Sequence, residues 1–211
     1  MEILDIHTHR QPLHPSQAIQ SCLPEAFSPR EGACYSMGIH PWYLCPESVE
    51  SQWESLLAAV HHPQVVAIGE AGLDKLVDAP LLLQQSVFER QIELSENLSL
   101  PLIIHAVRAA DELIALKKKY QPRQAWVIHG FRGKQEQALQ YIHQGFYLSF
   151  GEHYQESALH VVPLDRLFLE TDESAVDIHL LYDRAASVLG MSAEELIKRI
   201  QQNIQSVFFS H

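Results

Sequence analysis

Short apolar runs alternate with amphipathic stretches along the whole chain. The runs are rich in Val, Ile, Leu and Phe and have the length of buried strands. Seven of them stand out, at residues 3–6, 34–38, 65–69, 100–104, 125–128, 146–150 and 166–169. Strands that alternate with helical segments are typical of βα units around a parallel sheet.

Helical spacing of apolar residues separates these runs. Two helices follow one another at the C-terminus, because Gly190 ends the first and Ser192 with Glu195 forms a capping box for the second. The residues that share a helical face are Val49, Trp53, Leu56, Leu57 and Val60; Val107, Ala110, Leu113 and Ile114; Ala138 and Ile142; and Leu196, Ile200, Asn203 and Val207.

Residues 10–32 fit the repeating pattern poorly. They contain Pro12, Pro15, Pro24 and Pro29, and only residues 18–23 resemble a further strand. We therefore predict an α/β fold, a TIM-type (β/α) barrel that is truncated or distorted at its second βα unit. No linker or repeat divides residues 1–211, so a single domain is expected.

Composition narrows the possible functions. With 46% apolar residues the chain can bury one substantial core, and no apolar run approaches the length that spans a bilayer. The acidic N-terminus lacks a secretory signal, so we expect a cytoplasmic protein. Cys22, Cys34 and Cys45 have no metal-ligand spacing and are expected to be incidental thiols. The net charge of −11 argues against a nonspecific nucleic-acid coat protein, but not against an enzyme that acts on a nucleic-acid end.

The candidate chemistry lies where the predicted strands end. In parallel α/β barrels the catalytic groups are mounted at this end, since the loops there converge on the barrel axis. The histidines and acids found there are Asp5, His7, His9, His40, Glu70, His105, His129, Glu170 and Asp172.

A metal site explains this set better than separate structural histidines do. His7 and His9 lie two apart on a strand, so both side chains point to one face. That pair alone is weak evidence, because a single histidine is often buried for structural reasons. Together with Glu70, His105, His129 and Asp172, however, the pair meets the needs of two divalent cations with one bridging acid.

Several motifs in this order resemble those of one known family. They are Asp5-Ile6-His7-Thr8-His9, Gly38-Ile39-His40-Pro41, Gly69-Glu70-Ala71-Gly72-Leu73-Asp74, the strand ending in His105, His129-Gly130-Phe131-Arg132-Gly133 and Leu169-Glu170-Thr171-Asp172. The chain resembles a short member of the TatD family of metal-dependent deoxyribonucleases, in the amidohydrolase superfamily.

The resemblance implies a metal-dependent hydrolase that cleaves phosphodiesters with a metal-activated water at a binuclear site. It places His7 and His9 on one metal, His105 and His129 on the other, and Glu70 between them. Asp172 would be both a ligand and the base, which makes Asp172 and Glu70 the catalytic residues, and His40 would lie near the substrate phosphate. The cofactors would be two divalent metal ions, with zinc, manganese, nickel, iron and magnesium all compatible with the ligands. The substrate would be a phosphoester, such as a DNA end or short single-stranded DNA, with no membrane and no obligate protein partner.

Three features depart from the family pattern. The stretch after His9 is short, Val107 followed by Arg108 stands where an Arg is usual, and residues 173–177 lead directly into a helix instead of a Pro-rich loop. We therefore expect a more open pocket and an altered substrate preference. Asn203 matches a common family Asn, but we expect it to make packing contacts and assign it no catalytic role.

Basic residues after the site-bearing strands are candidates for binding phosphate. They are Lys75, Arg108, Arg132 and Lys134, with Arg132 the strongest, although solvated loop charge is an equally good explanation for any one of them. Among the other histidines, His153 follows a strand and is a weaker candidate to face the pocket. Surface positions are expected for His14, His61, His62, His143, His160, His179 and His211.

Two alternatives remain at this point. The first is another enzyme of the amidohydrolase superfamily that acts on a different ester or amide. Some such enzymes bridge their metals with a carboxylated Lys, whereas this chain has Glu70 at that strand end, which favours the TatD-like arrangement. The second is a metal-stabilised binding protein that has lost catalysis, although all six expected ligands are present.

Overall fold

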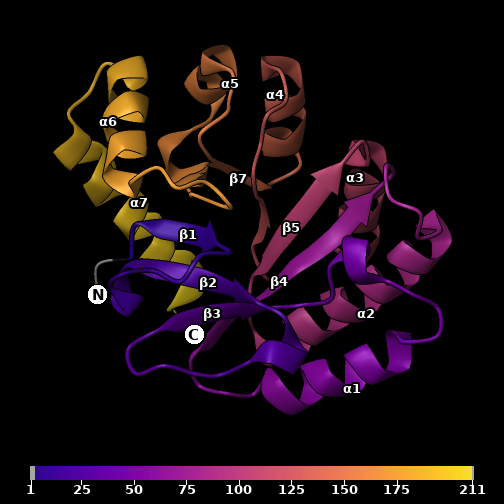
Figure 1. The fold of residues 1–211 in the computed structure, drawn as a ribbon. Helices are drawn as coiled ribbons and strands as arrows, with labels where there is room; N and C mark the ends of the chain where they lie inside the picture. The colour runs from indigo at the N-terminus through magenta and orange to yellow at the C-terminus, as the bar shows by residue number, and fades with distance from the viewer. Residues whose placement is uncertain (1–2, 211) are drawn as a thin grey trace.

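A computed structural model describes residues 3–210 and confirms the predicted α/β barrel. The described part of the chain contains eight parallel strands hydrogen-bonded in sequence order, so each strand pairs with the next one along the chain (Figure 1). The strands are β1 (Asp5–Thr8), β2 (Ala18–Cys22), β3 (Cys34–Met37), β4 (Val65–Asp74), β5 (Leu102–Val107), β6 (Trp126–Ile128), β7 (Tyr147–Phe150) and β8 (Leu167–Leu169).

The seam between β8 and β1 is closed just beyond the end of β8. Thr8 and Asp172 form a parallel bridge. The Asp172 amide donates to the His7 carbonyl at 2.9 Å, and the His9 amide donates to the Asp172 carbonyl at 3.0 Å. The residues that close the barrel therefore also carry the candidate chemistry.

Within residues 3–210, seven α-helices lie outside the strands (Figure 1). They are α1 (Val49–Ala59), α2 (Leu81–Leu98), α3 (Ala110–Tyr120), α4 (Gln135–His143), α5 (Glu156–Val161), α6 (Ile178–Leu189) and α7 (Ala193–Phe208). None of those in the described chain is long and apolar enough to cross a membrane. Val107, which we had placed on a helical face, lies instead at the end of β5, because that strand continues past His105.

Helix α2 shows why apolar spacing alone was an incomplete guide. Its buried face carries Gln84, Gln91 and Ser95 among apolar residues, which interrupts the pattern. Both glutamines bind backbone near the candidate site. Gln91 accepts from the Ile39 amide at 2.7 Å, and Gln84 accepts from the Asp74 amide at 2.7 Å. This helix therefore holds the chain just before His40 and at the end of β4.

The predicted distortion at the second βα unit is confirmed. β2 is present and pairs with both β1 and β3. Among residues 3–48, however, the connections around it contain only the short 3-10 helices η1 (Pro15–Gln17) and η2 (Pro24–Ala26). Proline lacks an amide donor and fits only the first turn of a helix, so this Pro-rich region forms turns in place of a covering α-helix.

Asn203 makes the packing contacts that we expected. Its side-chain amide donates to the carbonyls of Leu164 at 2.7 Å and Leu167 at 3.0 Å, which ties α7 to the start of β8.

Asn203→Ala is expected to lower the free energy of unfolding by about 1–3 kcal/mol, because it leaves both partly buried carbonyls without this donor. Urea unfolding measures the loss, and Gln202→Ala, at the exposed neighbouring position, is the control. The candidate chemistry at the strand ends should be unaffected, and a loss of activity without a fall in stability would contradict this purely structural role.

Candidate metal centre

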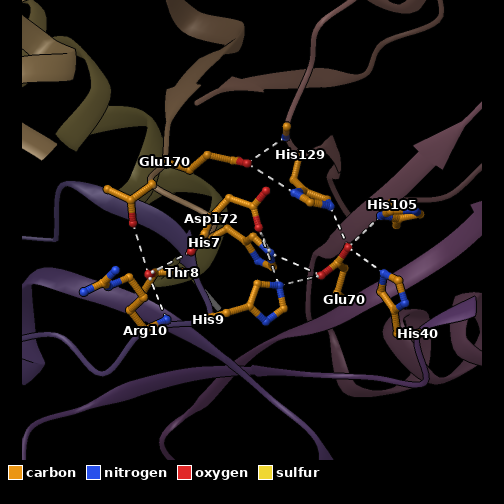
Figure 2. A network of polar contacts seen from close by, with 12 residues as sticks. His7, Thr8, His9, Arg10, His40, Glu70, His105, His129, Glu170 and Asp172 are labelled. Atoms are coloured by element: carbon orange, nitrogen blue, oxygen red, sulfur yellow. Dashed lines mark hydrogen bonds and ion pairs between the residues drawn. The ribbon is translucent and has the colours of Figure 1, made fainter. Parts of the chain in front are cut away.

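The Glu70 carboxylate lies at the centre of a ring of histidines (Figure 2). It is 5% exposed, and both of its oxygens face imidazole nitrogens. Oε1 lies 2.8 Å from His40 Nε2, 2.8 Å from His105 Nδ1 and 2.7 Å from His129 Nε2, and Oε2 lies 3.0 Å from His9 Nε2 and 3.3 Å from His7 Nε2. The structure thus brings five histidines from four separate parts of the sequence onto one carboxylate.

Close approach of β4 to β5 helps to form this cluster. Gly72 of β4 pairs with His105 of β5. A Cβ atom at Gly72 would collide with the carbonyl oxygen of His105, and its φ of +146° also disfavours any other residue. Glycine at this position therefore allows Glu70 and His105 to lie side by side.

His7 in β1 and His9 just after it point to one face, as their spacing predicted. Their rings meet edge to face with centroids 5.0 Å apart. His7 is fully buried, whereas the His9 side chain is 40% exposed toward the pocket. The pKa of His9 is raised, first by its hydrogen bond to Glu70 and in spite of partial burial.

Asp172 reaches the same histidines from the end of β8. Its Oδ1 lies 3.6 Å from His9 Nε2 and 3.9 Å from His7 Nε2. Its backbone is left-handed, with φ of 56°, a conformation that Asp tolerates better than most residues. The barrel-closing hydrogen bonds to β1 hold this conformation in place.

Asp5 supports the Asp172 loop and does not face the centre. Its carboxylate accepts from the Thr171 amide at 3.1 Å and from the Thr171 hydroxyl at 2.6 Å. Burial raises the pKa of Asp5 to about 7, against the lowering effect of these hydrogen bonds. Asp5, which the sequence placed beside the ligand candidates, is thus a positioning residue.

Outer carboxylates orient two of the histidines. Asp74 Oδ2 lies 3.0 Å from His105 Nε2, and Glu170 Oε1 lies 3.2 Å from His129 Nδ1. Burial by itself would raise the pKa of both acids, but their hydrogen-bonded histidines lower it, so both are ionised acceptors. In each neutral ring the outer nitrogen therefore carries the proton, so His105 Nδ1 and His129 Nε2 have lone pairs available to a cation. Metal-binding histidines commonly have this arrangement.

The sequence did not reveal these two partner roles. Asp74 was visible only as part of a motif, and Glu170 only as a strand-end acid beside Asp172. Their positions in those motifs were the available signal, but the pairing needs contacts 31 and 41 residues apart.

His40 differs from the other histidines around Glu70. Its Nδ1 accepts a hydrogen bond from the Trp42 amide at 3.0 Å, so in the neutral ring the proton lies on Nε2. Burial lowers the pKa of His40, which favours that neutral form in spite of Glu70. Its Nε2 then donates to Glu70 at 2.8 Å and has no lone pair for a cation.

The buried nitrogens of His7 indicate that a cation fits here. The ring is 0% exposed, and neither nitrogen has a hydrogen-bond partner within residues 3–210. Leaving a buried polar atom unpaired costs about 1–3 kcal/mol. Two triads that contain His7 have ligand atoms within 4.8 Å of one another, one with Glu70 and His129 and the other with His9 and Asp172.

The negative charges of Glu70 and Glu170 also favour a cation at this centre. Burial would raise the pKa of Glu70, but the imidazoles, His129 foremost, lower it well below its ordinary value. Burial would lower the pKa of His129, but Glu70 and Glu170 raise it well above the ordinary value. A protonated His129 thus balances these acids without metal, and a divalent cation can replace that proton.

All members of the cluster except the buried His7 line a pocket of about 820 Å³. Of the four predicted phosphate-binding residues, Arg108 and Arg132 line this pocket, while Lys75 and Lys134 do not. Lys75 is paired instead with Glu112 at 2.6 Å. Cys22 also lines the pocket, and all three cysteines are free thiols.

His153 does not face the pocket, so its candidacy was wrong. Its side chain is 70% exposed and lies 3.9 Å from the Glu152 carboxylate. His153 lies three residues after the end of β7, where the chain bends before α5, and its side chain therefore points outward. His62 is half-buried, His211 lies outside the described residues, and the remaining predicted surface histidines, His14, His61, His143, His160 and His179, are exposed.

Known proteins with similar sequences belong to the family that the motifs resemble. Residues 16–209 match the family described as TatD related DNase. The chain is 34% identical over 168 residues to the human 3'-5' RNA nuclease TATDN2. This match covers 74% of this chain and 22% of TATDN2. It is 30% identical over 207 residues to the 3'-5' ssDNA/RNA exonuclease TatD of Pantoea vagans, covering 84% and 78%.

Lengths and folds can also be compared. The metal-dependent hydrolase YabD of Bacillus subtilis is 36% identical over 147 residues, and the match covers 65% of this chain and 57% of YabD. The chain therefore spans under two thirds of several relatives that it matches. The crystal structure of YJJV, a TATD homolog from Escherichia coli, superposes with a TM-score of 0.80 at 22% identity, covering 98% of both chains, which shows a shared fold.

Proposed function

This chain belongs to the TatD related DNase family, and from that membership we propose that it is a metal-dependent phosphodiesterase acting on the ends of single-stranded nucleic acid. Relatives named as a 3'-5' RNA nuclease and a 3'-5' ssDNA/RNA exonuclease support this substrate class. The observation that carries the proposal is the buried Glu70 carboxylate facing five imidazole nitrogens at the floor of an open pocket.

The donor atoms divide into two sets that share Glu70. His7, His9 and Asp172 surround its Oε2 side, and His105 Nδ1 and His129 Nε2 surround its Oε1 side. Two cations held by these sets would lower the pKa of water and neutralise charge on the phosphate oxygens. Imidazole with carboxylate is compatible with zinc, manganese, iron and nickel, and less so with magnesium.

The remaining chemistry belongs to the protein's own side chains. Asp172 is 24% exposed at the pocket floor, where its carboxylate can accept the proton of the attacking water. The water oxygen bonds to phosphorus while the bond to the leaving oxygen breaks. Arg108 and Arg132 line the pocket and suit the binding of phosphate oxygens. His40 fixes the orientation of Glu70 through its Nε2–H and lines the pocket that would receive the substrate.

The test combines metal analysis with a substrate panel. We expect the purified protein to contain divalent metal, to lose activity with a chelator, and to regain it when that metal is restored. The panel contains short single-stranded DNA, RNA, an aryl phosphodiester, a lactone and an amide.

Cleavage of the phosphodiesters alone is the expected result. Turnover of the lactone or the amide alone would identify another hydrolase of the superfamily. Tight metal binding without any turnover would identify a binding protein and reject the proposed function.

A further inference from the structure

Two large aromatic side chains stand exposed at the edge of the metal-centre pocket. Trp42 is 55% exposed and Tyr43 is 53% exposed, and both line the pocket. Within residues 3–210 they are the only aromatic members of the group of strongly exposed large hydrophobic side chains. Exposed aromatic rings beside a reaction centre call for an explanation by a ligand, because apolar surface of this kind is normally buried.

The Trp42 ring is held firmly although it is exposed. Its Nε1 donates to Asp74 Oδ2 at 2.8 Å, the same oxygen that His105 Nε2 approaches at 3.0 Å. The indole meets His40 edge to face, with centroids 5.1 Å apart and an angle of 86°. It meets His105 in the same way at 5.7 Å and 79°. The ring is therefore fixed in place next to the metal centre without being buried by it.

Tyr43 extends the same wall. It belongs to the 3-10 helix η3 (Pro41–Tyr43), which the His40 side chain caps by accepting from the Trp42 amide. The Tyr43 ring lies 5.7 Å from that of His40. Pro41 at the first position of the turn further restricts the backbone. Both rings are thus presented by one short turn in the loop that follows β3.

Charge is arranged on the other side of the pocket. Arg108 follows β5 and Arg132 follows β6, whereas the aromatic turn follows β3. In the strand order of the barrel, Glu70 on β4 lies between the aromatic side and the arginines. A ligand that crosses the centre thus meets flat apolar rings on one side and guanidinium groups on the other.

We propose that Trp42 and Tyr43 form a stacking wall for the base of the terminal nucleotide of a single-stranded substrate. A nucleotide has the required chemistry, since its base has a flat π face and its phosphate is anionic. Aromatic side chains bind single-stranded nucleic acid in this way with little dependence on sequence. The inference rests on the proposed function and adds the feature that holds the strand end.

The net charge makes such contacts important. At −11 the chain repels a polyanion at long range, so affinity for a nucleic acid must come from short-range contacts. Stacking on one aromatic side chain typically changes affinity by about 10- to 100-fold. This wall therefore supplies affinity that the surface charge does not.

Intrinsic tryptophan fluorescence reports binding directly. The protein has three tryptophans, of which Trp126 is fully buried and Trp53 lies on α1 outside the pocket. Metal-loaded Asp172→Asn protein is titrated with a short oligothymidylate and with the same strand carrying an abasic residue at its 3' end. A second pair of strands, complete and with the abasic residue at the 5' end, tests the other end in the same way.

We expect the complete strand to quench the fluorescence and to bind about 10- to 100-fold more tightly than the matching abasic strand. Trp53→Phe in the same background should keep the quenching, and Trp42→Phe should abolish it. Equal affinity for complete and abasic strands at both ends, or unchanged quenching after loss of Trp42, would overturn the proposal.

Turnover by otherwise native enzyme separates stacking from support of the metal centre. Trp42→Leu removes both the ring and the hydrogen bond to Asp74, whereas Trp42→Phe keeps a ring and removes only the hydrogen bond. Tyr43→Leu and Tyr43→Phe form the second pair. We expect the Leu variants to raise KM about 10- to 100-fold on complete strands and hardly at all on abasic ones.

Metal content measured in all four variants serves as the control. If the Leu variants raise KM equally for complete and abasic strands, the rings only support the fold, and the proposed stacking wall is rejected. If the protein binds and discriminates strands but cleaves none, the wall stands and the proposed activity fails. If it cleaves both strand types with equal KM, the activity stands and the wall fails.

Discussion

Asp172→Asn is expected to keep metal at the centre but to lower the hydrolysis of phosphodiesters about 10²- to 10⁴-fold, the usual cost of losing a positioned base. The amide cannot accept the proton of the attacking water. The Asp172 side chain is more exposed than that of Glu70, and its carboxylate lies 3.6 Å or more from His7 and His9. Glu70 and four imidazoles remain available as ligands.

The measurement is the single-turnover rate on an aryl phosphodiester and on short single-stranded DNA, with metal content determined on the same sample. Glu173→Gln, which also removes a charge from the pocket lining, is the matched control and should stay within a few-fold of the parent. If Asp172→Asn is folded, metal-loaded and as fast as the parent, Asp172 is not the base.

Glu70→Gln is expected to lose metal as well as activity. All five imidazole nitrogens of the centre lie within 3.3 Å of this one carboxylate, and the neutral amide lacks the negative charge that would hold cations among them. Even changes to residues beyond the ligands commonly cost about 10- to 100-fold in metal affinity, so the loss here should exceed that range. Activity should fall with the metal and should not return at metal concentrations that saturate the parent.

His40→Ala is the informative comparison for Glu70→Gln. Because His40 donates from Nε2 and holds its own Nδ1 against the Trp42 amide, its removal should leave the metal content close to that of the parent. The defect should appear in KM and kcat for phosphodiesters. Similar metal loss in both variants, measured by elemental analysis after dialysis, would show that His40 is itself a ligand.

The sequence by itself determined the barrel and the residues that meet at its centre. Apolar runs alternating with helical patterns require βα units, and parallel strands bring their carboxyl ends to one rim. The strand-end positions of Glu70, His105, His129 and Asp172 therefore predicted that these side chains converge. The period of two along a strand likewise placed His7 and His9 on one face.

Element boundaries depended on contacts that local patterns do not contain. β4 runs to Asp74 instead of ending at Gly69, because its polar end is buried against β5 and α2. Helix α2 escaped the apolar pattern since its buried glutamines hydrogen-bond the backbone of distant segments. Polar residues in a core are recognised only once their partners are known.

Tertiary structure alone decided the roles within the centre. The pairing of His105 with Asp74 and of His129 with Glu170 determines which ring nitrogen has a free lone pair, and each pair joins residues more than 30 positions apart. Likewise, the hydrogen bond from the Trp42 indole to Asp74 can form only when β3 and β4 lie side by side. The sequence determined which side chains reach the rim, because strand geometry is local, whereas hydrogen-bond direction and exposure arise only when distant strands pack together.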